Sequence, residues 1–249
     1  MKIGFIGLGN MGKFMSMNLD KAGHQVYGFD LNSKVFKDLK NFNIIETKSL
    51  EEISLCAEII ITMLPDGKAV DTVYNSLIKN LKPNTLIVDC STIDVKTTKK
   101  LHQNCNDRKI LILDAPVSGG TIGAQNGTLT FMVGGQQEAF NKMEPLFNIM
   151  GKKAILCGAG GTGQAVKVCN NLILAITMAG IGEALQIANA NNLETQKLFE
   201  VVSTSTGSCW AINNYFPVKG VGPQSPADSN FEPGFSSSLM YKDLLLASE

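Results

Sequence analysis

The sequence predicts an α/β fold in which a doubly wound, mostly parallel sheet is followed by a long linking helix and an all-α C-terminal domain. Three observations predict it. A short apolar segment at residues 2–6 runs directly into a glycine-rich turn. Strand-like and helix-like segments then alternate as far as residue 157, and a nearly uncharged helical stretch extends to about residue 192. Strands that alternate with helices form a parallel sheet that is covered on both faces.

The composition is that of an ordinary globular protein. The chain of 249 residues has 22 basic and 22 acidic side chains, a balance that gives no footprint for nucleic acid or an anionic membrane. Its six cysteines show no paired spacing and are expected to be free thiols. His24 and His102 lie far apart in polar surroundings; neither is assigned a role, and no metal site is expected. The most apolar run, residues 172–182, is too short to span a bilayer, and no targeting peptide is expected.

The first glycine-rich turn indicates a dinucleotide site. It lies between the strand at 2–6 and a helix that extends to about Lys21, and a second strand at 25–30 ends in an acidic residue. The glycines permit a tight turn, close approach of a pyrophosphate and packing of helix on strand. Asp30 would accept hydrogen bonds from both ribose hydroxyls and repel a 2′-phosphate, so NAD is the expected cofactor. The candidate cofactor-binding residues here are Gly7, Leu8, Gly9, Asn10, Met11, Gly12 and Asp30. The pattern is that of a Rossmann-type domain.

Two further loops are expected at the ligand-binding edge, because such sheets bind ligands beyond the carboxyl ends of their strands. The strand at 58–63 ends at Leu64-Pro65, and the strand at 85–89 leads to Ser91-Thr92. On local grounds the first pair is equally consistent with a simple turn, and the second with the N-cap of the next helix.

An uncharged segment at residues 116–124 follows the strand at 110–114. Ser118, Gly119 and Gly120 expose backbone amides, which is how a protein binds a carboxylate without a cation. A flexible surface loop is equally consistent with these residues.

The long helical stretch contains a candidate acid–base group. Its expected N-cap is Thr162, and its only basic residue is Lys167, in the second turn, where the positive end of the helix dipole disfavours a cation. No Asp or Glu lies between Glu144 and Glu183, so the charged form of this lysine should be disfavoured. Asn171 follows one turn later and can face the same site. The alternative is a lysine that simply snorkels to solvent.

Three parts of the chain are expected: an NAD-binding domain at 1–161, a linking helix at 162–192 and a partial all-α domain at 193–249. In the last part, helices are expected at 193–203 and 239–247, with a loop-rich segment between residues 207 and 233. The chain stops at residue 249 in mid-helix without a cap signal, so this domain is expected to be truncated.

Taken together, the motifs resemble those of the β-hydroxyacid dehydrogenase family, and the likeness covers the whole chain. The motifs are GFIGLGNMG at 4–12, MLP at 63–65, DCSTID at 89–94, DAPVSGGTIGA at 114–124 and GTGQAVKVCNN at 161–171. Segments 209–222 and 234–247 are similar to those of the branch that acts on 3-hydroxyisobutyrate.

The resemblance implies NAD-dependent oxidation of 3-hydroxyisobutyrate to methylmalonate semialdehyde, a step of valine catabolism. It makes Lys167 the catalytic residue. The residues that it assigns to the substrate are Ser118, Gly119, Gly120 and Asn171. Those that it places near the nicotinamide cofactor are Leu64, Pro65, Thr92 and Lys242. It also implies a homo-oligomer, a dimer or tetramer, located in the mitochondrial matrix of a eukaryote or in the bacterial cytoplasm.

Two alternatives stay open. Sister branches of the family act on tartronate, glyoxylate or succinic semialdehyde. A non-catalytic dinucleotide-binding protein would follow if the second domain were truncated in the natural protein, because relatives continue with further helices. Truncation would also leave the apolar face of the long helix exposed.

Overall fold

The computed structural model describes residues 1–232 and 235–248, which form two compact units, residues 1–167 and 168–249. The three-part division expected from the sequence, with a boundary near residues 160–161, stays a prediction. Residue 234, where the last family-like segment begins, and residue 249, the expected mid-helix end, lie outside the described residues.

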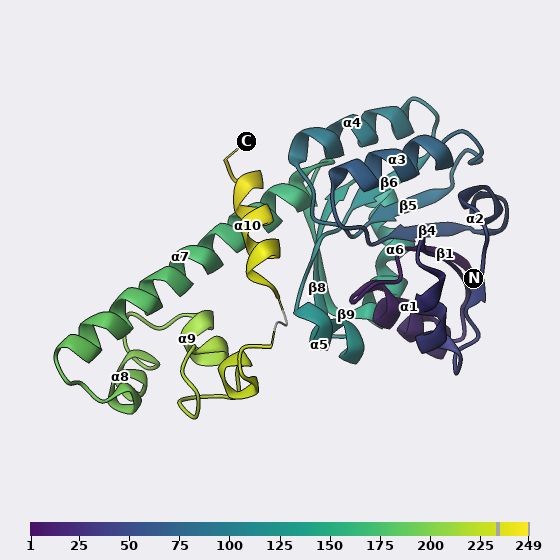
Figure 1. Ribbon diagram of the computed structural model, residues 1–249. Coiled ribbons are helices and arrows are strands. Elements are labelled where there is room, and N and C mark those ends of the chain that lie inside the picture. Colours follow the sequence, from purple (N-terminus) through teal and green to yellow (C-terminus); the bar gives the residue numbers. More distant parts are fainter. Residues whose placement is uncertain (233–234, 249) are drawn as a thin grey trace. The chain divides into compact units, whose positions relative to one another are not determined.

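The first unit is built on one sheet, which has nine strands among the described residues (Figure 1). These are β1 (Lys2–Ile6), β2 (Gln25–Phe29), β3 (Ile45–Glu46), β4 (Ile59–Thr62), β5 (Leu86–Asp89), β6 (Leu111–Asp114), β7 (Val117–Ser118), β8 (Leu129–Gly135) and β9 (Gly151–Gly158). The order is β3-β2-β1-β4-β5-β6-β8-β7, with β9 paired to β8. Strands β1 to β6 pair in parallel, whereas β8 is antiparallel to β6 and β7. The predicted Rossmann-type, mostly parallel sheet is confirmed.

Helices cover both faces of this sheet (Figure 1). They are α1 (Gly12–Lys21), α2 (Leu50–Cys56), α3 (Gly67–Leu77), α4 (Val95–Asn106), α5 (Gly120–Asn126) and α6 (Gln137–Met150), with a 3₁₀ helix, η1 (Ser33–Leu39). Alternate strand residues point to opposite faces. In β4, Ile59 and Ile61 join the core beneath α1, α5 and α6, while Ile60 joins the core beneath α2, α3 and α4. The strands are therefore apolar on both sides, as parallel strands in α/β proteins are.

Strand register brings the loops of interest to one edge of the sheet. Ile6 pairs with Phe29 on one side and with Thr62 on the other, and Thr62 pairs with Asp89. The carboxyl ends of β1, β2, β4 and β5 thus lie in a row. The strand order reverses between β1 and β4, which is where Rossmann folds bind their ligands.

Two parts of the first unit differ from the expectation. The uncharged segment at 116–124 is ordered structure, because Val117–Ser118 pairs with β8 as β7 and Gly120 begins helix α5. The segment between β2 and β4 contains η1, β3 and α2, which the sequence pattern did not predict. These elements are short, so their apolar residues complete too few turns to show a period.

Helix α7 (Thr162–Ala190) begins in the first unit and continues into the second. The second unit also contains α8 (Thr195–Val202), α9 (Trp210–Tyr215), the 3₁₀ helix η2 (Pro226–Ser229) and α10 (Ser237–Leu246). The second unit has a small core around Ile181, Ile212 and Phe216. Phe199 packs on Phe216 with ring centroids 5.2 Å apart. The expected all-α composition is confirmed for the described residues of this unit, and the predicted loop-rich segment contains α9 and η2.

Part of α7 is apolar and exposed, as Ile173, Ile176 and Ile187 each leave more than 60% of their surface open. By length and mean hydropathy alone, α7 could cross a membrane: the mean hydropathy of its most apolar window is 1.5, and 17% of that window is buried. The expectation from the sequence considered only the most apolar run, residues 172–182, which is shorter than the helix. A core helix of a soluble protein passes the same test, so the absence of membrane contact stays a prediction, as does the expected truncation.

Candidate active site

The glycine-rich turn after β1 has the geometry that a dinucleotide needs. Gly7 has a φ of +91°, and a side chain there would collide with the carbonyl oxygen of Met63. A side chain at Gly12 would collide with the carbonyl oxygen of Gly7, which shows how closely the start of α1 packs on the turn. At Gly9 a Cβ would meet nothing within 4 Å, so the backbone there is open to a phosphate. The turn therefore fits the cofactor that the sequence predicts.

The acidic residue at the end of β2 is fastened to this turn. Asp30 Oδ2 accepts a hydrogen bond of 2.8 Å from the backbone N–H of Leu8, and Oδ1 accepts one of 2.8 Å from the N–H of Asn32. Each carboxylate oxygen has a second lone pair for a ribose hydroxyl. The carboxylate of Asp30 is therefore held in place by the same loop that is expected to bind the pyrophosphate.

The loops after β4 and β5 are joined through Ser91. The backbone N–H of Leu64 donates to Ser91 Oγ at 2.8 Å, and Ser91 Oγ donates to Asp89 Oδ1 at 2.6 Å. Asp89 is buried, and its Oδ1 also accepts from Thr62 Oγ1 at 2.8 Å. The two loops that carry Leu64, Pro65 and Thr92 thus share one hydrogen-bond network at the carboxyl edge of the sheet. The alternative in which the Ser91-Thr92 pair caps α4 is wrong, because Asp94 caps that helix.

The turn between β7 and α5 places Ser118, Gly119 and Gly120 at the surface of the first unit. Gly119 has a φ of +130° and Gly120 a φ of +60°, so the backbone bends sharply here. Both glycines are exposed, and Ser118 is half-buried. The turn is therefore open at the surface, and α5 rather than a flexible loop follows it.

Lys167 is buried in the second turn of α7, and the beginning of this helix is fastened to the end of β6. Asp114 Oδ1 accepts from the N–H of Gly161 at 2.8 Å, and Oδ2 accepts from the N–H of Gln164 at 3.0 Å. The prediction that Thr162 caps the helix is wrong, since Thr162 is itself the first helical residue and the N–H groups of Gln164 and Ala165 donate to Asp114 and to the carbonyl of Gly161. The carboxylate of Asp114, at the end of β6, accepts from the free amides at the helix start instead.

Lys167 has an interaction partner in the folded chain. The lack of acidic residues near it in the sequence therefore does not leave it without one.

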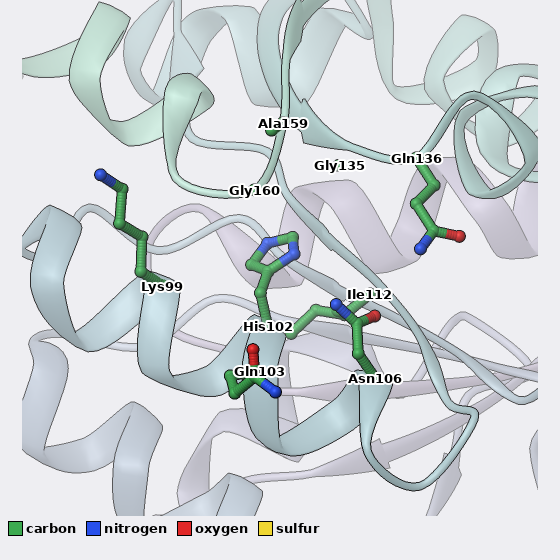
Figure 2. A pocket seen from close by; sticks show the side chains of 9 residues that line it. All are labelled: Lys99, His102, Gln103, Asn106, Ile112, Gly135, Gln136, Ala159 and Gly160. Atoms are coloured by element: carbon green, nitrogen blue, oxygen red, sulfur yellow. The ribbon is translucent and has the colours of Figure 1, made fainter.

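His102, to which the sequence reading assigned no role, supports the same carboxylate. Its Nε2 lies 2.9 Å from Asp114 Oδ1, and the residue is buried. A side chain at Gly160 would collide with the imidazole. Figure 2 shows the ring of His102 directed towards Gly160. Both residues line a pocket of about 290 Å³, together with Lys99 and Asn106. No residue predicted for the active site lines this pocket.

In the second unit, Asn171 and Lys242 are linked through Asp243, a residue that the sequence reading missed. Asn171 Nδ2 donates to Asp243 Oδ2, and Asn171 Oδ1 accepts from Asn170 Nδ2 at 2.9 Å. Lys242 Nζ lies 3.3 Å from Asp243 Oδ1. Asn171 and Asp243 are buried, so the amide of Asn171 has a fixed orientation. Only the short spacing between Lys242 and Asp243 was visible in the sequence.

Comparison with known proteins identifies the family. A family model described as the NAD binding domain of 6-phosphogluconate dehydrogenase matches residues 2–159, and one described as NAD-binding of NADP-dependent 3-hydroxyisobutyrate dehydrogenase matches residues 161–249. A probable 3-hydroxyisobutyrate dehydrogenase of Mycobacterium bovis is 44% identical over 98% of this chain and 83% of its own length. An NAD-dependent L-serine dehydrogenase of Pseudomonas aeruginosa is 42% identical over 100% of this chain and 84% of its own length.

A solved structure of the 3-hydroxyisobutyrate dehydrogenase of Mycobacterium tuberculosis with L-serine is also similar. It has a TM-score of 0.95 and 44% identity, and the match covers 99% of this chain and 85% of that one. The fold, the glycine-rich turn and these matches define an NAD-binding oxidoreductase of the β-hydroxyacid dehydrogenase class. Within that class, the chain belongs to the 3-hydroxyisobutyrate dehydrogenase family.

Proposed function

We propose that the chain catalyses NAD-dependent oxidation of 3-hydroxyisobutyrate to methylmalonate semialdehyde, with Lys167 as general base and, in reverse, general acid. The observation that carries this proposal is the placement of Lys167. It is buried one turn beyond a helix start that Asp114 fastens to the ligand-binding edge of a dinucleotide-binding sheet. Near the N-terminus of α7, the helix dipole favours the uncharged amine, which is the form that takes a proton.

The roles of the other residues follow from their chemistry. The amides of Ser118, Gly119 and Gly120 would bind the substrate carboxylate, and Asn171, oriented by Asp243, would hold the hydroxyl end. Lys167 Nζ would take the hydroxyl proton. A bound nicotinamide would supply the acceptor for the hydride of the substrate carbon. Leu64, Pro65, Thr92 and Lys242 are proposed contacts of the cofactor.

The cofactor preference and the substrate are separate questions. Asp30 supports NAD, because its carboxylate would repel a 2′-phosphate, although the second family model is described by its NADP-dependent members. L-Serine is a second candidate substrate, since one relative is named for its oxidation. It is also a 3-hydroxy acid, and differs from 3-hydroxyisobutyrate at the α-carbon, where an ammonium replaces a methyl group.

The test is the absorbance of reduced nicotinamide formed with NAD and each of four acids: 3-hydroxyisobutyrate, L-serine, glycerate and 4-hydroxybutyrate. We expect the highest kcat/KM with 3-hydroxyisobutyrate. A higher value with L-serine would replace the proposed substrate while leaving the reaction class intact. Absence of turnover with all four, in protein that binds NADH, would favour the non-catalytic alternative.

A further inference from the structure

Gln164 is a completely buried residue to which neither the sequence pattern nor the proposed chemistry gives a role. It lies in the first turn of α7, three residues before Lys167. Most glutamines on helices point to solvent, but the side chain of Gln164 does not. Instead, both of its polar atoms bond to the backbone of the loop that follows β5.

The two hydrogen bonds of this side chain are complementary. Gln164 Nε2 donates to the carbonyl oxygen of Ser91 at 2.7 Å, and Gln164 Oε1 accepts from the N–H of Ile93 at 3.2 Å. Rotating the amide by 180° would place oxygen against oxygen and N–H against N–H, so only one orientation satisfies both partners. The side chain of Gln164 therefore binds the backbone of Ser91 and Ile93, the two residues on either side of Thr92.

The backbone of Gln164 is fixed as firmly as its side chain. Its N–H donates to Asp114 Oδ2 at the end of β6. A side chain at the preceding residue, Gly163, would collide with the carbonyl oxygen of Met132 in β8. The first turn of α7 is thus pressed against the sheet, and Gln164 ties it to the loop after β5. Ser91 Oγ in turn accepts from the N–H of Leu64, and this hydrogen bond connects the loop after β5 to the loop after β4.

We propose that Gln164 is a positioning residue that sets the distance between the amine of Lys167 and the Ser91–Ile93 loop, and hence between the base and the reacting carbon. The inference rests on the proposed function of Lys167 and Thr92. Lys167 lies three residues further along the helix, a rise of about 4.5 Å. If the start of α7 shifted relative to the Ser91–Ile93 loop, Lys167 would move with it. Misplacement of a catalytic group by about 1 Å can cost up to about 100-fold in rate.

The direct test of the bridge is amide hydrogen exchange at Ile93, measured in the Gln164→Met variant. Methionine keeps the length of the side chain and removes both hydrogen bonds. We expect exchange of the Ile93 N–H to be at least about 10-fold faster than in the wild type, because its acceptor is lost. The matched control is Gln186→Met, the same substitution at an exposed position of α7, which should leave Ile93 exchange unchanged.

The test of positioning is kcat in Gln164→Met and Gln164→Glu, measured from about pH 5 to pH 9 well below the melting temperature of each variant. Gln164→Met should lose about 10-fold to 100-fold in kcat at every pH. A protonated glutamic acid can donate to Ser91 and accept from Ile93 as glutamine does, whereas a carboxylate meets the Ser91 carbonyl with no proton. The kcat of Gln164→Glu relative to the wild type should therefore rise as pH falls. A role in stability alone would not produce this dependence.

Three outcomes would overturn the proposal. The first is a kcat of Gln164→Met within two-fold of the wild type. The second is a ratio of the kcat of Gln164→Glu to the kcat of the wild type that does not change with pH, as expected for Gln164→Met. The third is unchanged Ile93 exchange in Gln164→Met. If the wild type itself turned over none of the four acids, the proposed function would fail, and the exchange experiment alone would then decide whether the bridge exists.

Discussion

The carboxylate of Asp114 and the imidazole of His102 form a buried pair, with Nε2 of the histidine 2.9 Å from Oδ1 of the aspartate. The same carboxylate accepts from the backbone of Gly161 and Gln164. One side chain at the end of β6 thus satisfies the start of the helix that carries Lys167. A second side chain, His102 of α4, contacts Oδ1, the same carboxylate oxygen that accepts from Gly161.

Replacing Asp114 should destabilise the first unit. In Asp114→Asn, one carboxylate oxygen becomes an NH₂ group, which must face an N–H donor of α7 or the imidazole. We expect a loss of about 2–3 kcal/mol in the free energy of unfolding, since a buried donor is left unsatisfied. Urea denaturation measures it. Asp107→Asn, at an exposed position, should change the stability by less than about 0.5 kcal/mol. Equal effects of the two substitutions would mean that the carboxylate does not hold the helix.

Removing the amine of Lys167 should abolish most of the activity without affecting the cofactor. Lys167→Ala is expected to lower kcat by about 100-fold or more, because proton transfer to a positioned base contributes that much. The dissociation constant of NADH, measured by its fluorescence, should stay within about two-fold of the wild type. Lys152→Ala, at an exposed lysine, is the control and should retain full turnover. Wild-type turnover in Lys167→Ala would exclude this lysine from the mechanism.

The charge of Asp30 should decide between the two nicotinamide cofactors. Asp30→Asn keeps an oxygen that can accept from the N–H of Leu8, but removes the charge that repels a 2′-phosphate. The ratio of kcat/KM for NAD to that for NADP should fall by about 10-fold, in line with the loss of a hydrogen bond to a charged group. Asp38→Asn, at an exposed carboxylate, should leave the ratio unchanged. A ratio that does not move in Asp30→Asn would remove this residue from ribose recognition.

The sequence was sufficient for the parts of the fold that depend on local periodicity and chain order. The apolar strands, the glycine turn at Gly7–Gly12 and the acidic end of β2 are adjacent in the chain, so their arrangement could be predicted from known rules. The segment at 116–124 was harder. Its small residues are compatible with a loop, and only pairing with β8 shows that Val117 and Ser118 are a strand.

The connections of the candidate site could not be predicted, because they join distant positions through single side chains. Asp114 and Gln164 are 50 residues apart, and Gln164 and Ser91 are 73 residues apart. Thr162 satisfied the local rule for an N-cap, yet its hydroxyl bonds to Ala159 and the helix amides meet Asp114 instead. Local rules identify which groups need a partner, whereas the fold determines which side chain provides it.

The buried carboxylate of Asp89 should give the protein a measurable pH dependence of stability. Burial raises the pKa of Asp89, and the nearby charge of Asp114 raises it further, while hydrogen bonds from Ser91 and Thr62 act in the opposite direction. An acid whose pKa is raised by folding binds its proton more tightly in the folded state. Its contribution to stability is therefore present below the unfolded pKa and is lost as the pH rises through the folded pKa.

Asp89→Asn removes this titration while keeping an oxygen that can accept from Ser91 and Thr62. The free energy of unfolding of the wild type, relative to that of Asp89→Asn, should fall as the pH is raised from about 4 to about 7, because the wild type alone must ionise a buried group. Urea unfolding at several pH values measures the difference, and Asp107→Asn provides the control for an exposed carboxylate. A relative stability that rises over this range would show that folding lowers the pKa of Asp89. The hydrogen bonds from Ser91 and Thr62 would then outweigh the cost of burial.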